Sequence, residues 1–323
     1  MGYAIGTVTS GGGGGNANHG MLDVIVTLAT ANGWTTQRYV NTGTEREWIG
    51  KSLGLSGTEE IFIGFKTFQD IPGDWYNLKC ATFIGYISGN SFETQPGIKI
   101  TTCPSHNNSV TYFVTANAQR IVGCLKVGTP VYEHFYCGKF FPYAKPGEYP
   151  SPLICAAMFD GESTQRYSNT TQEFPYPGNY YDADTNLWIR EQGGNWVEVT
   201  CHPFMNRNVT ANALAGPQTS NCMVPADAGA DAYYQVEPIV MMELSVNTTP
   251  INIYGELDGV FFISGFNNGV ENVVQVGGTP VDQTGMTVLQ AVDAIIAASG
   301  RAFVMCQNVY RTTWRDFVGL EMS

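Results

Sequence analysis

Charged residues are scarce in this sequence, and basic residues are fewer than acidic ones. Only 14% of the 323 residues are Asp, Glu, Lys or Arg, whereas about a quarter is usual for globular proteins. The 28 acidic residues outnumber the 16 basic ones, which leaves a formal net charge of -12. Binding along nucleic acid requires clustered Lys and Arg that neutralise phosphates. The composition therefore argues against specific nucleic-acid binding.

Long apolar runs are also absent. No segment approaches the roughly 18 consecutive apolar residues that span a bilayer. The first residues, Met1-Gly2-Tyr3-Ala4, include neither the basic nor the apolar region of a secretory signal. We therefore expect a protein that is made soluble in a cytoplasm and has no membrane partner.

Closely spaced cysteine pairs are missing, because none of the eight cysteines belongs to a CxxC motif. Cytosolic cysteines are kept reduced and pack as small apolar side chains. The sequence therefore favours buried thiols, with disulfide closure outside the cell as the alternative and the pairing left open. The eight positions are Cys80, Cys103, Cys124, Cys137, Cys155, Cys201, Cys222 and Cys306.

Nucleotide and calcium motifs occur only as fragments. Gly50-Lys51-Ser52 matches the end of a phosphate-binding loop, but Glu45 occupies the position of the first glycine of that motif. The stretch Asp182-x-Asp184-x-Asn186 begins like a calcium loop, in which alternating oxygen ligands converge on the ion. The glycine and the final Glu of the calcium pattern are missing. Neither fragment predicts a cofactor or a metal site.

Histidines and cysteines are too dispersed to predict a zinc site. A structural zinc takes four ligands in closed spacing, and nothing nearby in the sequence joins the local His and Cys pairs. In an extended strand from Val131 to Cys137, His134 and Cys137 point to opposite faces. We therefore expect no metal. The pairs considered are Cys103 with His106, His134 with Cys137, and Cys201 with His202.

Catalytic signatures are equally sparse. No GxSxG motif is present, and no Ser or Cys lies in a recognisable nucleophile signature. Glu256 and Asp258 alternate along an extended segment, as a carboxylate pair for sugar hydrolysis would, but acidic residues beside a hairpin turn are far commoner. We expect no enzymatic activity and no cofactor, with a hydrolase acting on the cell envelope as a minor alternative.

What the sequence does contain is the pattern of a β-rich protein. Its 37 glycines and 17 tyrosines favour turns and strands over long helices. Short apolar or alternating runs between turn residues predict a mainly β fold, an antiparallel β-sandwich or meander with one or two short helices and long loops. The expected strands are 61–65, 76–87, 110–115, 120–127, 131–137, 187–190, 196–200, 236–246, 251–254, 260–263, 273–276 and 303–310.

Two helices are expected. Asn18 precedes apolar residues at helical spacing that end before Gly33, and a second apolar stripe covers Thr287 to Ser299. The five consecutive glycines at 11–15 are too flexible to hold one shape alone. The predicted division is a Gly-rich N-terminal arm or loop (1–20), a β-rich lobe with an N-terminal helix (21–157) and a second β-rich lobe with long loops and the second helix (158–323). A single unit is the alternative to two lobes.

Aromatic residues are dense between Tyr132 and Leu153, where four prolines interrupt them. Aromatic side chains bury a large apolar area at low entropic cost, and proline keeps a loop in shape before its partner arrives. This combination predicts an assembly interface that another protein or a neighbouring copy covers. The predicted interface residues are Tyr132, Phe135, Tyr136, Phe140, Phe141, Tyr143 and Tyr149.

Several stretches of the chain resemble one group of proteins. They are Val110 to Val127 with Val131 to Leu153, Gly57 to Gly97, and Gly255 to Phe266 with Gln307 to Thr312. Their texture is similar to structural virion proteins of contractile-tailed bacteriophages, particularly neck or collar and tail-associated proteins.

The resemblance implies a non-enzymatic component that forms a ring of identical copies. Its partners would be neighbouring virion proteins of the neck, the tube or sheath, or the baseplate, and its location would be the virion, after assembly in the host bacterial cytoplasm. A receptor- or glycan-binding tail or baseplate appendage is the alternative. Four tryptophans that look exposed in the sequence motivate it: Trp34, Trp75, Trp188 and Trp196.

Overall fold

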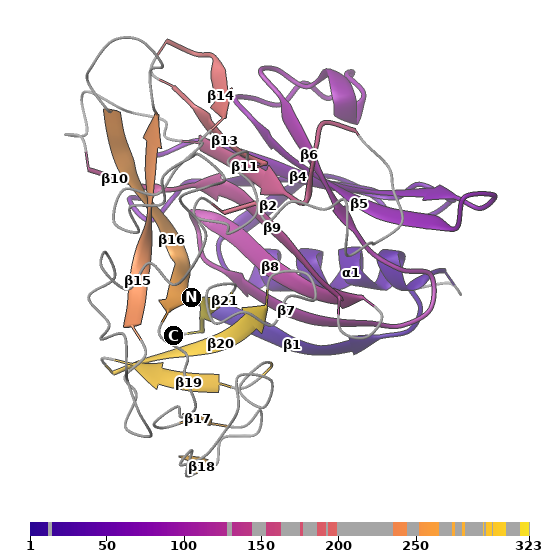
Figure 1. Ribbon diagram of the computed structural model, residues 1–323. Helices are drawn as coiled ribbons and strands as arrows, with labels where there is room; N and C mark the ends of the chain where they lie inside the picture. Colours follow the sequence, from indigo (N-terminus) through magenta and orange to yellow (C-terminus); the bar gives the residue numbers. More distant parts are fainter. Residues whose placement is uncertain are drawn as a thin grey trace, which may run out of the picture.

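The computed structural model confirms the predicted fold class, because the chain is mainly β and its strands pair antiparallel. The structure describes residues 1–11, 15–127, 131–143, 153–162, 175–176, 186–191, 193–198, 235–243, 252–264, 273–274, 280–281, 293, 295–298, 300–307 and 317–322. Within these ranges there are one α-helix, α1 (Ala17–Ala31), one short 3-10 helix, η1 (Phe92–Thr94), and three sheets (Figure 1).

The sheets contain seven, six and eight strands. The central, seven-stranded sheet has the spatial order β1 (Gly2–Val8), β7 (Val110–Ala116), β8 (Arg120–Val127), β9 (Val131–Lys139), β11 (Leu153–Ala157), β13 (Leu187–Arg190) and β14 (Trp196–Glu198). The six-stranded sheet has the order β12 (Phe159–Asp160), β6 (Lys99–Pro104), β5 (Trp75–Phe83), β4 (Ile61–Asp70), β3 (Glu47–Ser52) and β2 (Trp34–Val40). The eight-stranded sheet has the order β10 (Phe141–Pro142), β16 (Asn252–Ser264), β21 (Phe317–Glu321), β20 (Arg301–Gln307), β19 (Ile295–Ala298), β17 (Val273–Val274) and β18 (Pro280–Val281), with β15 (Gln235–Glu243) also paired to β16.

The central sheet is covered on both faces. Side chains alternate between the two faces along a strand. In β9, Phe135 and Cys137 therefore join the core shared with α1 and the six-stranded sheet, whereas Tyr132 and Tyr136 join the core shared with the eight-stranded sheet. Figure 1 shows the resulting order, with β4, β5 and β6 on one side, β7, β8 and β9 in the middle, and β15, β16 and β20 on the other. The protein is a three-layer β-sandwich.

The first predicted helix is confirmed as α1, which packs with its apolar face between the central and the six-stranded sheet. It begins earlier than the sequence indicated, because the capping residue is Asn16 rather than Asn18. The N–H of Asn16 donates to Nδ1 of His19 over 3.3 Å, which closes the first turn. The helix ends before Gly33, whose φ of +94° favours glycine.

The predicted N-terminal arm at 1–20 is wrong for most of its length. Gly2–Val8 is a strand of the central sheet paired with β7, and residues 17–20 already belong to α1. The flanking glycines pack closely against the helix, because a side chain on Gly11 or Gly15 would clash with His19. At these two positions glycine permits close approach of the backbone rather than flexibility. Residues 12–14 lie outside the described residues.

The predicted second helix, 287–299, is wrong at its C-terminal end. Residues 295–298 form β19, which pairs with β17 and β20. The register joins Ala298 to Arg301, and Gly300 between them has a φ of +77°. The glycine expected to stop a helix therefore turns a hairpin. Isoleucines at 295 and 296 suit a strand because they are β-branched, and pairing on both sides decides the outcome. Residues 287–292 lie outside the described residues.

The sheets do not follow the boundary predicted at 157/158. Beyond that point β12 pairs with β6 in the six-stranded sheet, and β13 and β14 extend the central sheet. Before it, β10 pairs with β16 of the eight-stranded sheet. Strands from both predicted lobes therefore share all three sheets.

Candidate functional site

The aromatic segment predicted as an assembly interface divides into a buried and an exposed part. The buried residues are Tyr132, Phe135, Tyr136 and Phe140. The assembly interpretation is wrong for these four, because the chain itself covers both faces of β9 and the residue that follows it. Phe141 is 55% exposed and Tyr143 is 49% exposed. Tyr149 lies outside the described residues.

Phe141, Tyr143 and Glu256 form a surface cluster at one edge of the eight-stranded sheet, which we name the β10 patch. Phe141 pairs with Glu256 across β10 and β16. The Tyr143 hydroxyl donates to Oε2 of Glu256 over 2.7 Å. Burial and this hydrogen bond raise the pKa of Tyr143, so the hydroxyl stays a donor at neutral pH. The two exposed rings are thus held on the sheet by backbone pairing and by a carboxylate.

Two residues further along β16, an ion pair between buried Arg120 and partly exposed Asp258 joins the central sheet to the eight-stranded sheet. Arg120 on β8 is fully buried, and its Nε lies 3.4 Å from Oδ2 of Asp258. Nδ2 of Asn117 donates to the same oxygen over 2.7 Å, and Nη1 of Arg120 donates to Oγ1 of Thr115 over 2.5 Å. Glu256 and Asp258, considered above as a carboxylate pair, therefore have separate structural partners.

A second contact between these layers centres on Asp293, within the segment predicted to be helical. Its backbone is left-handed, with a φ of +65°, and its N–H donates to the carbonyl oxygen of Met305 over 2.9 Å. The Asp293 carboxylate accepts from the Tyr132 hydroxyl over 2.9 Å and pairs with Lys126. Burial and the nearby carboxylate raise the pKa of Tyr132, which keeps the hydroxyl protonated. Tyr132 therefore binds another layer of its own chain.

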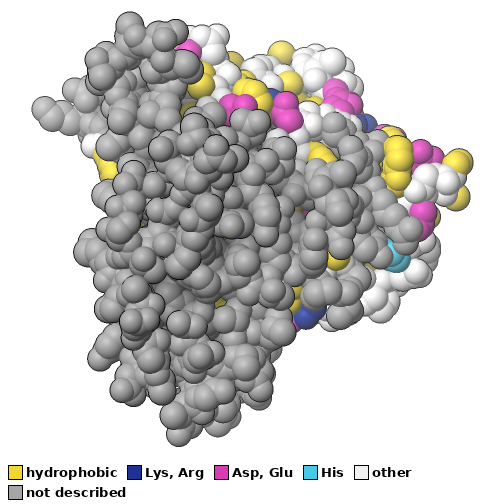
Figure 2. Space-filling view, in the orientation of Figure 1, with side chains coloured by type: hydrophobic (Ala, Val, Ile, Leu, Met, Phe, Trp, Pro, Cys, Tyr) yellow, Lys and Arg dark blue, Asp and Glu magenta, His cyan; other side chains and the backbone are white. Residues whose placement is uncertain are grey.

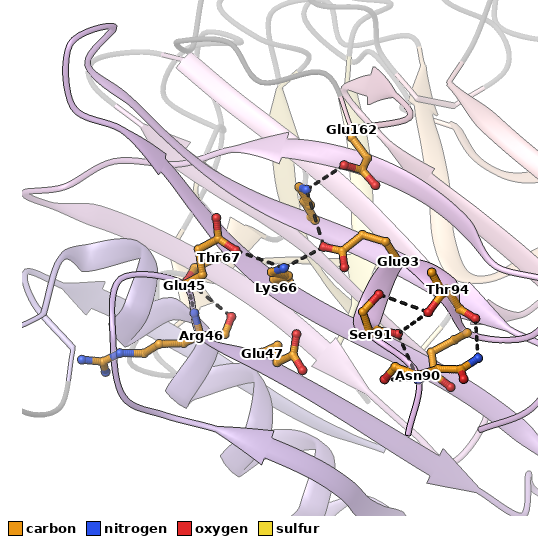
Figure 3. Close-up of polar contacts among 12 residues, drawn as sticks. Glu45, Arg46, Glu47, Lys66, Thr67, Asn90, Ser91, Glu93, Thr94 and Glu162 are labelled. Atoms are coloured by element: carbon orange, nitrogen blue, oxygen red, sulfur yellow. Dashed lines mark hydrogen bonds and ion pairs between the residues drawn. The ribbon is translucent and has the colours of Figure 1, made fainter. Parts of the chain in front are cut away.

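The outer face of the six-stranded sheet carries an ionic network (Figure 3). Lys66 on β4 lies directly opposite Lys79 on β5, an arrangement that is repulsive by itself. Oε1 of Glu93 in η1 lies 2.7 Å from Nζ of Lys66 and 3.9 Å from Nζ of Lys79. Glu45 pairs with Lys66 and Glu162 with Lys79, each over 3.0 Å. The carboxylates remove the repulsion and hold η1 against the sheet.

The network shifts the pKa of two of its members. Burial alone lowers the pKa of Lys66, but hydrogen bonds to Glu93 and Glu45 outweigh burial and raise it. Burial likewise opposes ionisation of Glu93, yet Lys66 and Lys79 hold the Glu93 pKa below its usual range. The depressed pKa of Glu93 means that its stabilising contribution is lost as acid protonates the folded carboxylate, and that of Lys66 is lost at alkaline pH. Both groups are charged at neutral pH and act structurally.

Exposed apolar side chains on the six-stranded sheet are Val40 at the end of β2 and, in the turns and connections, Leu53, Leu55, Ile71, Ile84 and Ile87. Figure 2 shows hydrophobic and acidic side chains interspersed along the described part of one face. Single exposed apolar residues are ordinary on protein surfaces. They do not mark a site by themselves.

The six cysteines that the structure describes are free, and all six are buried, as the sequence predicts. Cys137 lies opposite Cys155 across β9 and β11, and the Cys155 thiol donates to the carbonyl oxygen of Cys80 over 3.4 Å. Burial raises the pKa of Cys80 to about 11 and the pKa of Cys137 and Cys155 well above the usual range. These thiols are therefore protonated packing groups, and none of the six forms a disulfide. Cys201 and Cys222 lie outside the described residues.

The described histidines are engaged within the fold. In the described ranges no three His, Cys, Asp or Glu side chains converge as a metal site. His134 is fully buried between the central and the eight-stranded sheet, where its Nε2 donates to the carbonyl oxygen of Gln307 over 2.8 Å. Its ring meets Tyr176 edge-on at 5.8 Å between centres. Burial lowers the pKa of His134 to about 4, so the ring is neutral. His202 lies outside the described residues.

Acid is expected to destabilise the protein through His134. Its folded pKa of about 4 lies below the value of about 6.5 in unfolded chains, so the unfolded state binds a proton first. The stability that the protein gains from keeping the His134 ring neutral is fully present above about pH 6.5. It falls as the pH approaches 4, by on the order of 3 kcal/mol. His134→Gln keeps a donor but cannot titrate, and should flatten urea-unfolding stability between about pH 7 and 4.5. Equal pH slopes in variant and wild type would contradict this role.

The nucleotide and calcium fragments do not form their sites in the described residues. Gly50-Lys51-Ser52 lies within β3 rather than in a loop. Lys51 pairs with Glu60, and Oγ of Ser52 donates to the carbonyl oxygen of Ala118 over 2.5 Å. These polar groups are therefore used by the sheet. Asp182 and Asp184 of the calcium fragment lie outside the described residues.

The tryptophans behind the glycan-binding alternative have structural partners. Trp34 is buried, and its Nε1 donates to the carbonyl oxygen of Asn117 over 2.7 Å, so its predicted exposure is wrong. The Trp188 ring is covered by the Lys99 ammonium, 3.2 Å from the ring centre. Nε1 of Trp196 donates to the carbonyl oxygen of Gly97 over 3.0 Å. Trp75 is partly exposed at the start of β5.

Sequence reasoning missed three charged residues with structural roles: Arg120 and Asp293, which join the central and the eight-stranded sheets, and Glu93, which holds η1 on the six-stranded sheet. Arg120 had a local signal, because an arginine that opens an apolar strand needs a carboxylate partner once that strand is buried. The other two had none. Asp293 bonds a tyrosine 161 residues away and Glu93 a lysine 27 residues away, and only folding brings these groups together.

Comparison of the chain with protein-family models and with curated proteins finds no match. No helix in the described part of the chain is long and apolar enough to cross a membrane. The functional argument therefore depends on the surface that the described residues present, and the β10 patch is the exposed remainder of the predicted interface.

Proposed function

We propose that the chain is a non-enzymatic structural component of a tailed-phage virion, a ring-forming collar, neck or tail protein that joins neighbouring virion proteins. The β10 patch is the observation that carries this proposal. Phe141 and Tyr143 expose two large rings at a sheet edge, within the stretch that most resembles phage neck and tail proteins. The three-layer β-sandwich supplies a rigid support for such a patch.

The β10 patch has the character of an interface anchor. Aromatic residues are enriched at the centres of protein interfaces and among the residues that dominate binding energy. Glu256 holds the Tyr143 hydroxyl, and β16 pairs with Phe141. Because Glu256 holds the Tyr143 ring before a partner arrives, less side-chain entropy of that residue remains to be lost on binding.

Replacing both rings, as Phe141→Ser with Tyr143→Ser, is expected to reduce incorporation into virions at least about tenfold, since interface anchors typically contribute more than about 1.4 kcal/mol together. The measurement is quantitative mass spectrometry of purified particles from a phage whose own copy of the gene carries the changes. The isolated variant should keep the wild-type melting temperature, because both side chains are about half exposed.

Ile71→Ser is the matched control, because Ile71 is an exposed apolar residue in the turn between β4 and β5 of the six-stranded sheet. It should be incorporated normally. In wild-type particles, microscopy of a labelled subunit should show a ring at the neck or tail. Absence of the protein from purified virions would overturn the proposed function, whereas normal incorporation of the double variant would overturn only the role of the β10 patch.

The glycan-binding alternative keeps weaker support. Trp34 is buried, and the side chains of Trp188 and Trp196 already contact Lys99 and the Gly97 carbonyl oxygen. Binding of the purified protein to host surface glycan, lost on substitution of Trp75, would favour this alternative over the structural role.

A further inference from the structure

Sheet edges present unpaired N–H and C=O groups, and most edges of this protein are protected against pairing with another chain. Four edge strands are only two or three residues long: β10, β12, β14 and β18. The edge strand β2 carries Arg38 and is bulged between Thr36 and Arg38. The edge strand β15 contains Pro238 and two register shifts. Shortness, charge, bulges and proline are the usual means by which a protein prevents edge pairing.

β1 has none of these protections. It runs for seven residues from Gly2 to Val8, contains no proline and no charged residue, and pairs with β7 without any register shift. Among the described residues, β7 is the only strand paired to it, and no other backbone hydrogen bond is made by residues 2–8. β1 lies at the outer margin of the ribbon in Figure 1, and none of its residues is fully buried.

We propose that β1 is an assembly edge that pairs antiparallel with β1 of a second copy of this chain, so that the central sheets of the two copies become continuous. A second copy offers a strand of the same length that is equally free of bulges. The other sheet edges among the described residues are too short, bulged or charged to accept all seven residues. Two identical edges that pair antiparallel form a closed two-fold contact.

The sequence of β1 is compatible with itself in this arrangement. A two-fold axis at Ile5 sets Tyr3 opposite Thr7 of the other copy, and Ala4 opposite Gly6. Tyr3 is 54% exposed and Thr7 is also exposed, so both are available. An aromatic residue opposite a β-branched one is a favourable cross-strand pair. On the other face of the strand, Ala4 and Gly6 are small enough to lie opposite each other without steric conflict. Like charges do not meet, because β1 contains no charged residue.

Pairing through β1 does not require a virion role, so it is tested on the purified full chain by analytical ultracentrifugation over a range of concentrations. Wild type should form dimers. Tyr3→Lys with Thr7→Lys sets like charges opposite each other across the two-fold axis, and should weaken the dimer at least about tenfold. Tyr3→Lys with Thr7→Glu sets opposite charges at the same two positions, and should dimerise about as well as wild type.

The variant Tyr3→Lys with Thr7→Glu also serves as the folding control, because it changes the same two exposed positions as the variant with two lysines. Thr35→Lys, on an exposed position of the bulged edge β2, should leave the dimer unchanged. A wild type that stays monomeric at the highest soluble concentration would overturn the proposal. So would a dimer that survives Tyr3→Lys with Thr7→Lys, or one that both double variants abolish equally, since neither result fits antiparallel pairing centred on Ile5.

Discussion

Replacing Phe135 with alanine is expected to lower the free energy of unfolding by about 3–5 kcal/mol. Phe135 is fully buried between the central and the six-stranded sheet, with its ring 5.5 Å from that of Phe65 in an edge-to-face contact. The fit is tight, because a Cβ on Gly123 of the neighbouring strand would lie 2.5 Å from Cζ of Phe135. Truncation therefore removes apolar contacts and leaves a cavity between two sheets that cannot easily close.

Phe141→Ala is the matched control for this prediction. Phe141 lies in the same aromatic segment but is more than half exposed, so its truncation should change stability by no more than about 0.5 kcal/mol. Urea unfolding followed by circular dichroism measures both variants. Similar losses in the two variants would mean that the segment does not divide into a core part and a surface part.

Removing the charge of Arg120 is expected to have the second large effect. Arg120→Met should lower the free energy of unfolding by about 2 kcal/mol, because it removes the cation from an Asp258 carboxylate that is 26% exposed and keeps its hydrogen bond from Asn117. Lys51→Met breaks a pair in which Glu60 is 66% exposed, and should cost at most about 1 kcal/mol. The difference between the two losses in the free energy of unfolding measures how much more an ion pair matters when its cation is buried than when neither partner is buried. Equal losses would contradict a special role for Arg120.

Gly259 offers an independent probe of the same contact. Its φ is +75°, and a side chain on it would clash with the Arg120 guanidinium. Gly259→Ala should therefore be strongly destabilising alone and less so in the Arg120→Met background, where the shorter, flexible side chain can move aside. A double-mutant cycle in urea unfolding isolates this coupling. Additive losses would mean that Gly259 is required only for its backbone conformation.

Most of the central strands are predictable from local sequence. β8 and β13 match the predicted ranges, and β7 and β9 differ by one or two residues, because apolar runs between clear turn residues define them. β1 was missed because the neighbouring glycines looked like an arm. β19 was mistaken for helix because its short apolar run fits the periodicity of a helix as well as that of a strand. Only its pairing with β17 and β20 in the sheet distinguishes the two.

The candidate site was only partly predictable for the same reason. Aromatic density predicted a stretch that a partner covers, but four of its rings are buried by the chain itself and two are exposed, because a sequence does not record what covers a side chain. Tyr132 and Tyr136 are covered by the eight-stranded sheet of their own chain, and Phe135 by the six-stranded sheet. Phe141 and Tyr143 are left at the edge, where β10 is only two residues long.

The sequence by itself determined the mainly antiparallel β class, the first helix and the burial of the described cysteines, because each depends on composition or on contacts between near neighbours. The small number of charged residues also indicated that most strands could be buried, because burying a strand without ionic groups avoids the cost of desolvating charge. Only the tertiary structure decided that the central sheet is covered on both faces, which turned four predicted interface rings into core. It also decided which surfaces remain, the β10 patch and the β1 edge, because an edge exists only once the order of strands in the sheet is known.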